Sequence, residues 1–198
     1  MLKSILAARS DSIRHARRVL AEEPVYLDTE TTGLGGDAEI VEIAVVDHRG
    51  KPLVDTLIRP RGPIPPDATA VHGISDTDVA GAPAFTEVLP HLLDVLSNKH
   101  VAIYNAEHDL RLLRQSQPAS AWVDFGRIAA ATTCVMETYA RFYGDFHEYH
   151  RTFTWQSLDN AAVQCGLSWE SQAHRAMSDA MMARKVLQYM AARKEADG

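Results

Sequence analysis

The chain carries one segment that decides both its fold and its chemistry, Val25-Tyr-Leu-Asp-Thr-Glu-Thr-Thr-Gly-Leu34. Its apolar start predicts a buried strand over residues 25–28, and the glycines that follow predict a turn. Side chains alternate across a strand, so Asp28 and Glu30 share one face. Two carboxylates held this close repel each other unless a cation or a proton lies between them. The pair indicates either an oxygen-rich site for Mg²⁺ or Mn²⁺ or a solvated strand end that carries acids.

The composition describes a single domain of ordinary size without a membrane segment. The 198 residues are 46% hydrophobic and 23% charged, and no apolar run approaches the ~20 residues that span a bilayer. Residues 1–23 lack the apolar core and cleavage site of a secretion signal, and Cys134 and Cys165 lie outside any C-x-x-C spacing. We therefore expect a cytoplasmic protein with reduced thiols. The net charge of −6 means that any contact with nucleic acid is expected to be local.

Hydrophobic periodicity divides the chain into an N-terminal amphipathic helix, residues 1–23, and a main domain, residues 24–195. Strands come first, then an alternation, then helices, which predicts an α/β layer fold with a mixed sheet. Thr86 is the expected cap of one helix, with Pro90 in its first turn. In the main domain we expect strands at 25–28, 40–47, 53–59, 101–104 and 127–133, and helices at 68–72, 86–96, 110–114, 134–142, 157–165 and 173–192.

Two further motifs place acids at the start of later helices. In Val101-Ala-Ile-Tyr-Asn-Ala-Glu-His-Asp109 a short strand runs into a turn, and Asp109 falls at the mouth of a helix. In His174-Arg-Ala-Met-Ser-Asp179 the acid falls near the start of the last long helix. Taken singly, Asp179 fits better as an acid stabilised by the helix dipole, and His174 fits better as an ordinary histidine. Only the joint occurrence of the motifs indicates a functional site.

The three motifs in this order, with the spacer Ala70-Val-His-Gly-Ile-Ser-Asp-Thr-Asp-Val79, resemble the 3′-to-5′ exonucleases of the DEDD superfamily. The histidine matches the histidine-containing (DEDDh), DnaQ-like branch, which includes epsilon proofreading subunits and RNase T. The likeness covers the chain from Val25 to Tyr189. It implies a ribonuclease H-like fold, in which helices flank a mixed five-stranded sheet, here with an extra N-terminal helix.

The resemblance also implies a role for each motif residue. Asp28, Glu30, Asp109 and Asp179 would hold two divalent ions, Mg²⁺ or Mn²⁺, with Asp28 bridging them. Two ions ~3.5–4 Å apart neutralise the attacking and leaving oxygens in phosphodiester hydrolysis. His174 would be the general base, because an imidazole titrates near neutral pH. The implied activity is the release of nucleoside 5′-monophosphates from a 3′ end of DNA or RNA; a non-catalytic, polymerase-associated binding module is the alternative that the complete residue set disfavours.

Contacts with the terminal nucleotide are implied for a further group of residues. These are Thr31, Leu34, Asp67, His72 and Asn105. His72 fits equally well as a loop residue bonded to its own turn, and Asn105 as a support for the turn. Two roles are possible for Arg111, Arg114 and Arg175: they contact phosphates near the site, or they form part of a solvated surface. The expected partner is a nucleic acid with a free 3′ end, single-stranded; a DNA polymerase or a second copy of the chain are the candidate protein partners, and no membrane partner is expected.

Two positions depart from the family pattern, and one segment is not explained by it. Tyr104 stands where a histidine is common, and His108 stands where an aromatic residue is common. The segment Phe142–Trp155 combines aromatic residues, histidines and arginines in an expected loop. Such a surface would suit unpaired bases, although we favour aromatics that complete the core. A zinc site at His147 and His150 is disfavoured, because their spacing to either cysteine is irregular.

Overall fold

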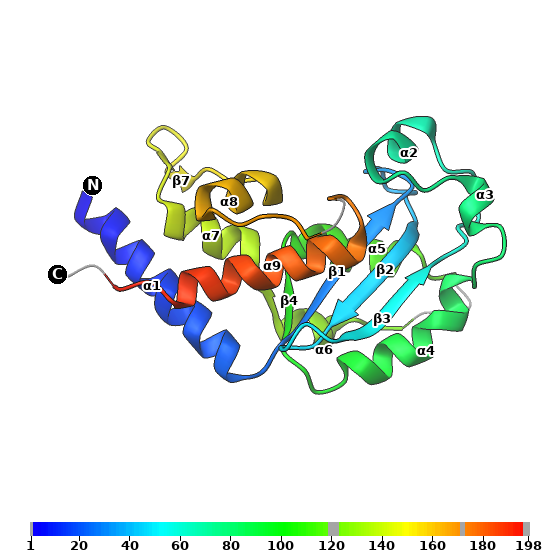
Figure 1. Cartoon of the computed structure of the whole chain (residues 1–198), viewed down its shortest axis with the longest axis horizontal. Helices are drawn as coiled ribbons and strands as arrows, with labels where there is room; N and C mark the ends of the chain where they lie inside the picture. The colour runs from blue at the N-terminus through cyan, green and yellow to red at the C-terminus, as the bar shows by residue number, and fades with distance from the viewer. Residues whose placement is uncertain (1, 119–122, 171–172, 196–198) are drawn as a thin grey trace.

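The structure is a computed structural model, and it describes residues 2–118, 123–170 and 173–195 (Figure 1). In chain order the elements are α1 (Leu2–Ala21), β1 (Val25–Thr31), β2 (Ile40–Val46), β3 (Pro52–Leu57), α2 (Pro66–His72), α3 (Asp76–Val79), α4 (Phe85–Leu96), β4 (Val101–Ile103), α5 (Ala106–Gln115), α6 (Gly126–Ala130), β5 (Thr132–Cys134), α7 (Val135–Tyr143), β6 (Phe146–His147), β7 (Thr152–Phe153), α8 (Leu158–Cys165) and α9 (Ala176–Ala191). None of the described helices is both long and apolar enough to cross a bilayer.

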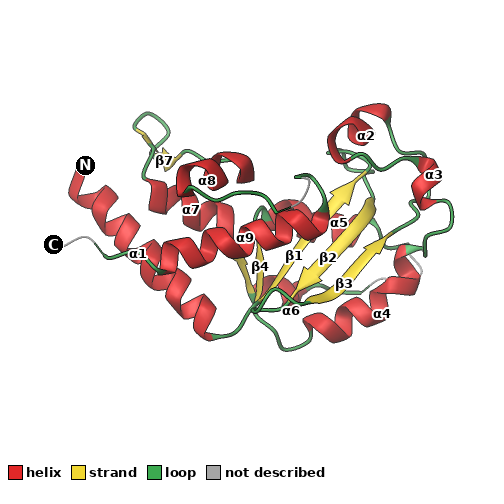
Figure 2. Ribbon diagram, in the orientation of Figure 1, coloured by secondary structure: helices red, strands yellow, loops and turns green. Residues whose placement is uncertain are grey.

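The main sheet has five strands in the order β3-β2-β1-β4-β5, with helices packed around it (Figure 2). β1, β2 and β3 form an antiparallel meander, because short turns connect them. β4 and β5 run parallel to β1, each reached through a helical connection. The predicted mixed five-stranded sheet is therefore confirmed. β6 and β7 form a separate two-stranded hairpin.

Alternation along β1 assigns its side chains to two cores. Leu27 packs in the cluster that contains Leu92 of α4 and Leu112 of α5. Tyr26 packs on the opposite face, in the cluster that contains Ile13 of α1 and Val186 of α9. Figure 1 shows α9 crossing the sheet over β1, with α1 and α7 beside it. Asp28 and Glu30 continue the face of Tyr26, so they point toward the layer that contains α9.

The expected amphipathic helix at the N-terminal end packs on the core. Its residues Ile13, Ala16 and Val19 are buried in the same cluster as the apolar face of α9, and α1 contacts both α7 and α9. Burial of Ile13 and of Val19 each stabilises the folded protein by about 1.5–3 kcal/mol. α1 and the described main domain therefore share one hydrophobic core.

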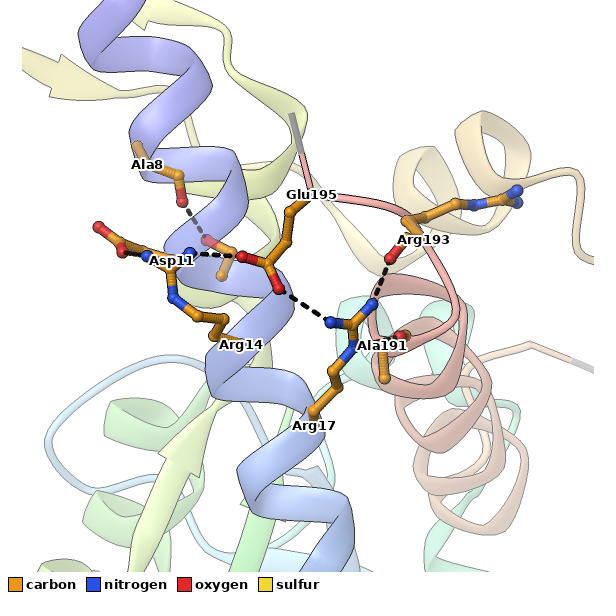
Figure 3. Close-up of polar contacts among 8 residues, drawn as sticks. Ala8, Asp11, Arg14, Arg17, Ala191, Arg193 and Glu195 are labelled. Carbon is orange, nitrogen blue, oxygen red and sulfur yellow. Dashed lines mark hydrogen bonds and ion pairs between the residues drawn. The ribbon is translucent and has the colours of Figure 1, made fainter. Parts of the chain in front are cut away.

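A polar network joins α1 to the C-terminal end of α9 (Figure 3). The Arg17 guanidinium donates from Nε to the carbonyl oxygen of Ala191 at 3.0 Å and from Nη2 to that of Arg193 at 2.7 Å. Its Nη1 also pairs with Glu195 at 2.9 Å. The last carbonyls of a helix have no partner within the helix, and a cation there also complements the helix dipole. Arg17 therefore caps α9 from a neighbouring helix.

Two local expectations were wrong. The segment expected as a strand over 127–133 is mostly α6, and only Thr132–Cys134 forms a strand. The Asp124 carboxylate accepts the N–H of Gly126 at 2.8 Å at the start of α6, and the alanines that follow favour a helix. α4 is not capped by Thr86. It begins at Phe85, and the Glu87 carboxylate accepts the N–H of Ala84 at 2.7 Å. Pro90 therefore lies in the second turn of α4 rather than the first, where it removes one helical hydrogen bond.

Candidate active site

Three carboxylates from two distant parts of the chain converge at one end of β1. Asp28 and Glu30 lie on β1 and Asp179 lies on α9, and each offers an oxygen within 4.8 Å of the others. All three residues are half-buried. Oxygen donors in such a group are the ligands that Mg²⁺ and Mn²⁺ prefer.

The position of Asp179 follows from the way α9 begins. The helix lies across β1 and β2, and Asp179 falls in its first turns, over the face that carries Asp28 and Glu30. The carboxylate Oδ1 accepts the backbone N–H of His174 at 3.0 Å, which holds the acid toward the start of the helix. A carboxylate at this end is also favoured by the helix dipole.

Asp109 approaches from the other side of β1. β4 ends at Ile103, which pairs with Leu27. From Asp28 onward, β1 therefore has no pairing with β4. α5 starts in this space and carries Asp109 in its first turn. Asp109 is only 3% exposed, and its Oδ1 accepts the hydroxyl of Thr29 at 2.7 Å.

Burial raises the pKa of all four acids, and repulsion within the group raises it further for Asp28, Glu30 and Asp109. Burial is the first cause for each one, and repulsion by Asp109 and Asp179 also raises the pKa of Asp28 well above its usual value. The pKa of Glu30 is raised to about 8, that of Asp109 to about 7 and that of Asp179 to about 6. Without a cation these side chains compete for protons near neutral pH. The donor set and its charge therefore fit divalent metal ions.

Glu42 is a fifth acid at the site, and sequence reasoning missed it. It lies on β2 opposite Glu30 and is 4% exposed. Its carboxylate accepts the N–H of Ala176 at 2.9 Å and hydrogen bonds from Nε and Nη2 of Arg175. Arg175, considered from sequence for a phosphate contact, is thus held by Glu42. The signal in the sequence is an acid inside the otherwise apolar run of residues 40–46, since a buried charge needs a partner.

His174 lies directly before α9, at the rim of the acid cluster. Its backbone φ is +57°, a conformation that few non-glycine residues adopt and that often marks a functional turn. The ring Nε2 lies 3.7 Å from Oδ2 of Asp159 on α8. Both side chains are about half exposed, so the ring is accessible to solvent and to a substrate.

His72 is buried, with both of its ring nitrogens in hydrogen bonds. It is 2% exposed, and its Nδ1 accepts the N–H of Ile74 at 3.0 Å. The proton is therefore on Nε2, which donates to the carbonyl oxygen of Thr31 at 3.1 Å. Burial lowers the pKa of His72, so the neutral ring is favoured. The imidazole fastens α2 to the end of β1.

The other residues expected near the nucleotide lie around the same end of the sheet. The Thr31 hydroxyl donates to the carbonyl of Gly33 at 2.8 Å, and Leu34 is 82% exposed. Asp67 is exposed in the first turn of α2, and Asn105 is exposed at the start of α5.

The loop that carries Leu34 is tied to α5. Arg111 donates from Nη1 to the carbonyl of Gly35 at 2.9 Å, and Nη2 lies 3.1 Å from His108. Gln115 donates to the same Gly35 carbonyl at 3.1 Å. Arg111 thus has a structural partner, and Arg114 is half-buried on the same helix.

Comparison with known proteins agrees with this geometry. The model of the RNase T family, described as exonuclease, matches residues 25–187. The chain belongs to the RNase T exonuclease family. The predicted resemblance to the DEDD superfamily is confirmed, and this exonuclease acts on nucleic acid as the family does.

Similar proteins include both relatives and solved structures. An uncharacterized exonuclease, CP81, of Escherichia phage 186 is 35% identical over 181 residues, covering 90% of this exonuclease and 93% of the relative. The DNA polymerase III subunit epsilon of Pasteurella multocida is 36% identical over 96 residues, which is 43% of this chain and 38% of that subunit. The structure of exonuclease X in complex with 5′ overhanging duplex DNA is 27% identical with a TM-score of 0.60, covering 84% of this chain and 90% of that one.

Proposed function

We propose that this exonuclease is metal-dependent and works from the 3′ end of a single strand, releasing nucleoside 5′-monophosphates. The observation that carries the proposal is the convergence of Asp28, Glu30 and Asp179 within 4.8 Å. Asp109 adds its negative charge beside Asp28, and His174 is bonded through its backbone to Asp179. These five residues match the family motif position by position.

The four acids would hold two divalent ions, Mg²⁺ or Mn²⁺. When bound, such ions neutralise the charge that develops on the attacking and leaving oxygens. Asp28 is repelled both by Asp109 of α5 and by Asp179 of α9, and this shared electrostatic contact supports a bridging role. The hydrogen bond from the Thr29 hydroxyl to Oδ1 orients the Asp109 carboxylate.

His174 would act as the general base. A ring nitrogen of His174 would accept the proton of the attacking water, and the half-exposed ring on a turn can reach that water. Asp159, whose Oδ2 lies 3.7 Å from Nε2, would stabilise the ring once it is protonated. The two residues come from α8 and from the turn before α9, so the pair brings both elements to the site.

The terminal nucleotide would lie against the end of β1 and the start of α2 and α5. Leu34 exposes its apolar side chain there and would contact the base, while Asp67 and Asn105 are exposed for polar contacts. Thr31 and His72 would shape this subsite from beneath, because their side chains are engaged with neighbouring backbone groups. A polymerase or a second copy of the chain stays a candidate protein partner; the likeness to an epsilon subunit supports the former.

The test is a nuclease assay with 5′-labelled single-stranded DNA, single-stranded RNA and duplex, in Mg²⁺, Mn²⁺ or EDTA. We expect a metal-dependent ladder that shortens from the 3′ end, with nucleoside 5′-monophosphates identified by chromatography. Asp28→Asn and His174→Ala should each lower the rate by at least about a hundredfold. The preferred labelled strand decides between a deoxyribonuclease and an exoribonuclease.

Matched controls separate site effects from general damage. Asp94→Asn and His91→Ala change the same residue types at exposed positions of α4 and should leave the rate unchanged. Purified protein that binds oligonucleotide but never shortens it with either ion would overturn the proposal and favour a binding module.

A further inference from the structure

The β6–β7 hairpin and the segment after it expose two large aromatic side chains. Tyr149 is 87% exposed and Trp155 is 62% exposed. Phe142 of α7 is buried in the core, Tyr143 is 44% exposed, and the rings of Phe146 and Phe153 meet edge to face at 5.2 Å. Phe146 and Phe153 pack against each other across the hairpin, whereas Tyr149 and Trp155 leave most of their ring surface in contact with solvent.

Imidazole and charged side chains lie in the same hairpin as Tyr149, with Asp145 and Glu148 also exposed among them. Arg151 is exposed at the hairpin turn, where its φ is +53°. The rings of His147 and His150 lie 4.5 Å apart, and His150 meets the Tyr149 ring edge-on at 5.0 Å. Arg141 lies over the Phe153 ring at 5.6 Å. Exposed aromatic rings flanked by guanidinium and imidazole groups suit a ligand with flat bases and negative phosphates.

Tyr104 connects this surface to the acid cluster. Its hydroxyl donates to the carbonyl oxygens of Gln156 at 2.9 Å and Ser157 at 3.1 Å, the two residues after Trp155. Tyr104 itself lies between β4 and α5, the helix that carries Asp109. The departure of this position from the family pattern therefore has a structural consequence, because a histidine does not offer the same phenolic hydroxyl.

A second attachment runs through α8. The Ser157 hydroxyl accepts the N–H of Asn160 and caps the helix, and two residues after Ser157 the carboxylate of Asp159 lies beside His174. Trp155 thus precedes a segment, residues 156–159, that contacts Tyr104 through Gln156 and Ser157 and contacts His174 through Asp159. Trp155 lies just before Ser157, at the end of α8 that carries Asp159 and contacts His174.

We propose that Trp155 and the hairpin turn, Tyr149 to Arg151, bind the unpaired nucleotides on the 5′ side of the terminal nucleotide. Trp155 stacks on a base close to the site, and the turn stacks on a base farther along while Arg151 contacts phosphate. The inference rests on the proposed function, which defines the direction of the strand. It predicts that affinity increases with strand length and that a single strand binds better than a duplex.

Binding is measured on the full chain in EDTA, so that no hydrolysis occurs. Fluorescence anisotropy with labelled dT15 and dT3 gives the affinity for a long and a short strand. Trp155→Ala and Tyr149→Ala should each weaken binding of the long strand about tenfold, since one base stack is lost. Tyr149→Ala should leave the affinity for the short strand nearly unchanged, because dT3 does not extend to the hairpin turn. Trp155→Phe keeps a ring and should retain most of the affinity. Val163→Ala, an exposed change on α8, is the control and should have no effect.

The result separates this inference from the proposed function. Length-dependent binding that requires Trp155, in a protein that never shortens the strand, supports the surface and overturns the proposed function. Normal 3′ shortening with equal affinity of the wild type, Trp155→Ala and Tyr149→Ala for the long strand overturns the surface, and it would direct attention to a protein partner for these aromatics. Circular dichroism of each variant must match that of the wild type before its affinity is compared.

Discussion

Arg175 and Glu42 form an ion pair that joins the start of α9 to β2. The Glu42 side chain is 5% exposed, whereas that of Arg175 is 40% exposed. Glu42 also accepts the N–H of Ala176 at 2.9 Å, so it caps α9 from another element. Because His174 precedes this helix and Asp179 lies in it, the pair positions two of the proposed functional residues over β1.

Arg175→Ala should destabilise the protein, because it leaves the Glu42 carboxylate buried without its partner. We expect a loss of about 2 kcal/mol in the free energy of unfolding, less than the ~3–5 kcal/mol of a fully buried pair, since water reaches Arg175. Urea unfolding measures this change. Adding Glu42→Gln should recover part of the loss, and a double variant that is less stable than Arg175→Ala would contradict the assignment.

The metal-free protein should become less stable as the pH rises from about 4 to about 8. Carboxyls titrate near pH ~4 when unfolded, whereas the pKa of Glu30 is raised to about 8 and that of Asp109 to about 7 in the folded protein. The folded state therefore holds more protons across this range, and raising the pH favours unfolding. Asp28→Asn removes one repelling charge and should raise the melting temperature in EDTA at pH 8. Asp94→Asn, at an exposed position of α4, should not raise the melting temperature.

Mg²⁺ or Mn²⁺ should stabilise the wild type, and more strongly at pH 8 than at pH 6. Protons and metal ions compete for the same carboxylates, so fewer protons remain to be displaced at the higher pH. Thermal melts with and without millimolar metal test this expectation. The increment should be lost in Asp28→Asn, and an equal increment in wild type and variant would show that the ions bind elsewhere.

His72→Leu should cost about 3 kcal/mol of stability, because it leaves the Ile74 N–H and the Thr31 carbonyl without their ring partners. It should also change the pH dependence. Burial depresses the pKa of His72 in the folded protein, so the contribution of the neutral ring is present above pH ~6.5 and is lost as the pH falls. Unfolding free energies between pH 5 and 7 should therefore be flatter in the variant, and a parallel decline in both proteins would exclude this role.

Arg17→Ala should destabilise the protein by about 1–2 kcal/mol, because two carbonyls at the end of α9 lose their donor. Arg18→Ala is a matched control, since Arg18 is an exposed neighbour on the same helix whose guanidinium contacts His15. Differential scanning calorimetry should show a lower melting temperature for the first variant only. Similar melting temperatures for the two variants would mean that water replaces Arg17 at little cost.

Most of the fold could be predicted from local patterns. The period-two alternation of β1 and the apolar runs of β2 and β3 set the meander, and Gly166 ends α8 in the left-handed conformation with a φ of +67°. A short apolar run does not distinguish a strand from a helix, which is why residues 127–133 predict a strand where α6 forms. Thr86 does not cap α4 because the competing interaction, from the Glu87 carboxylate, depends on where the chain turns into the helix.

The candidate site divides in the same way. The sequence places Asp28 and Glu30 on one face through strand geometry alone, and the family resemblance adds Asp109, His174 and Asp179. The role of Glu42 depends on a partner 133 positions away, so no local pattern reports it. The sequence supports two interpretations of His72, because only the tertiary structure shows which groups surround its ring.

The two caps on α9 fix the axial register of this helix. Glu42 holds its N-terminal end and Arg17 its C-terminal end, and each side chain comes from a different element. A helix rises only ~1.5 Å per residue, so a slide of one residue would break contacts at both ends at once. The spacing between the carboxylates of α9 and β1 is thus resistant to the small helix translations by which packed proteins commonly respond to perturbation.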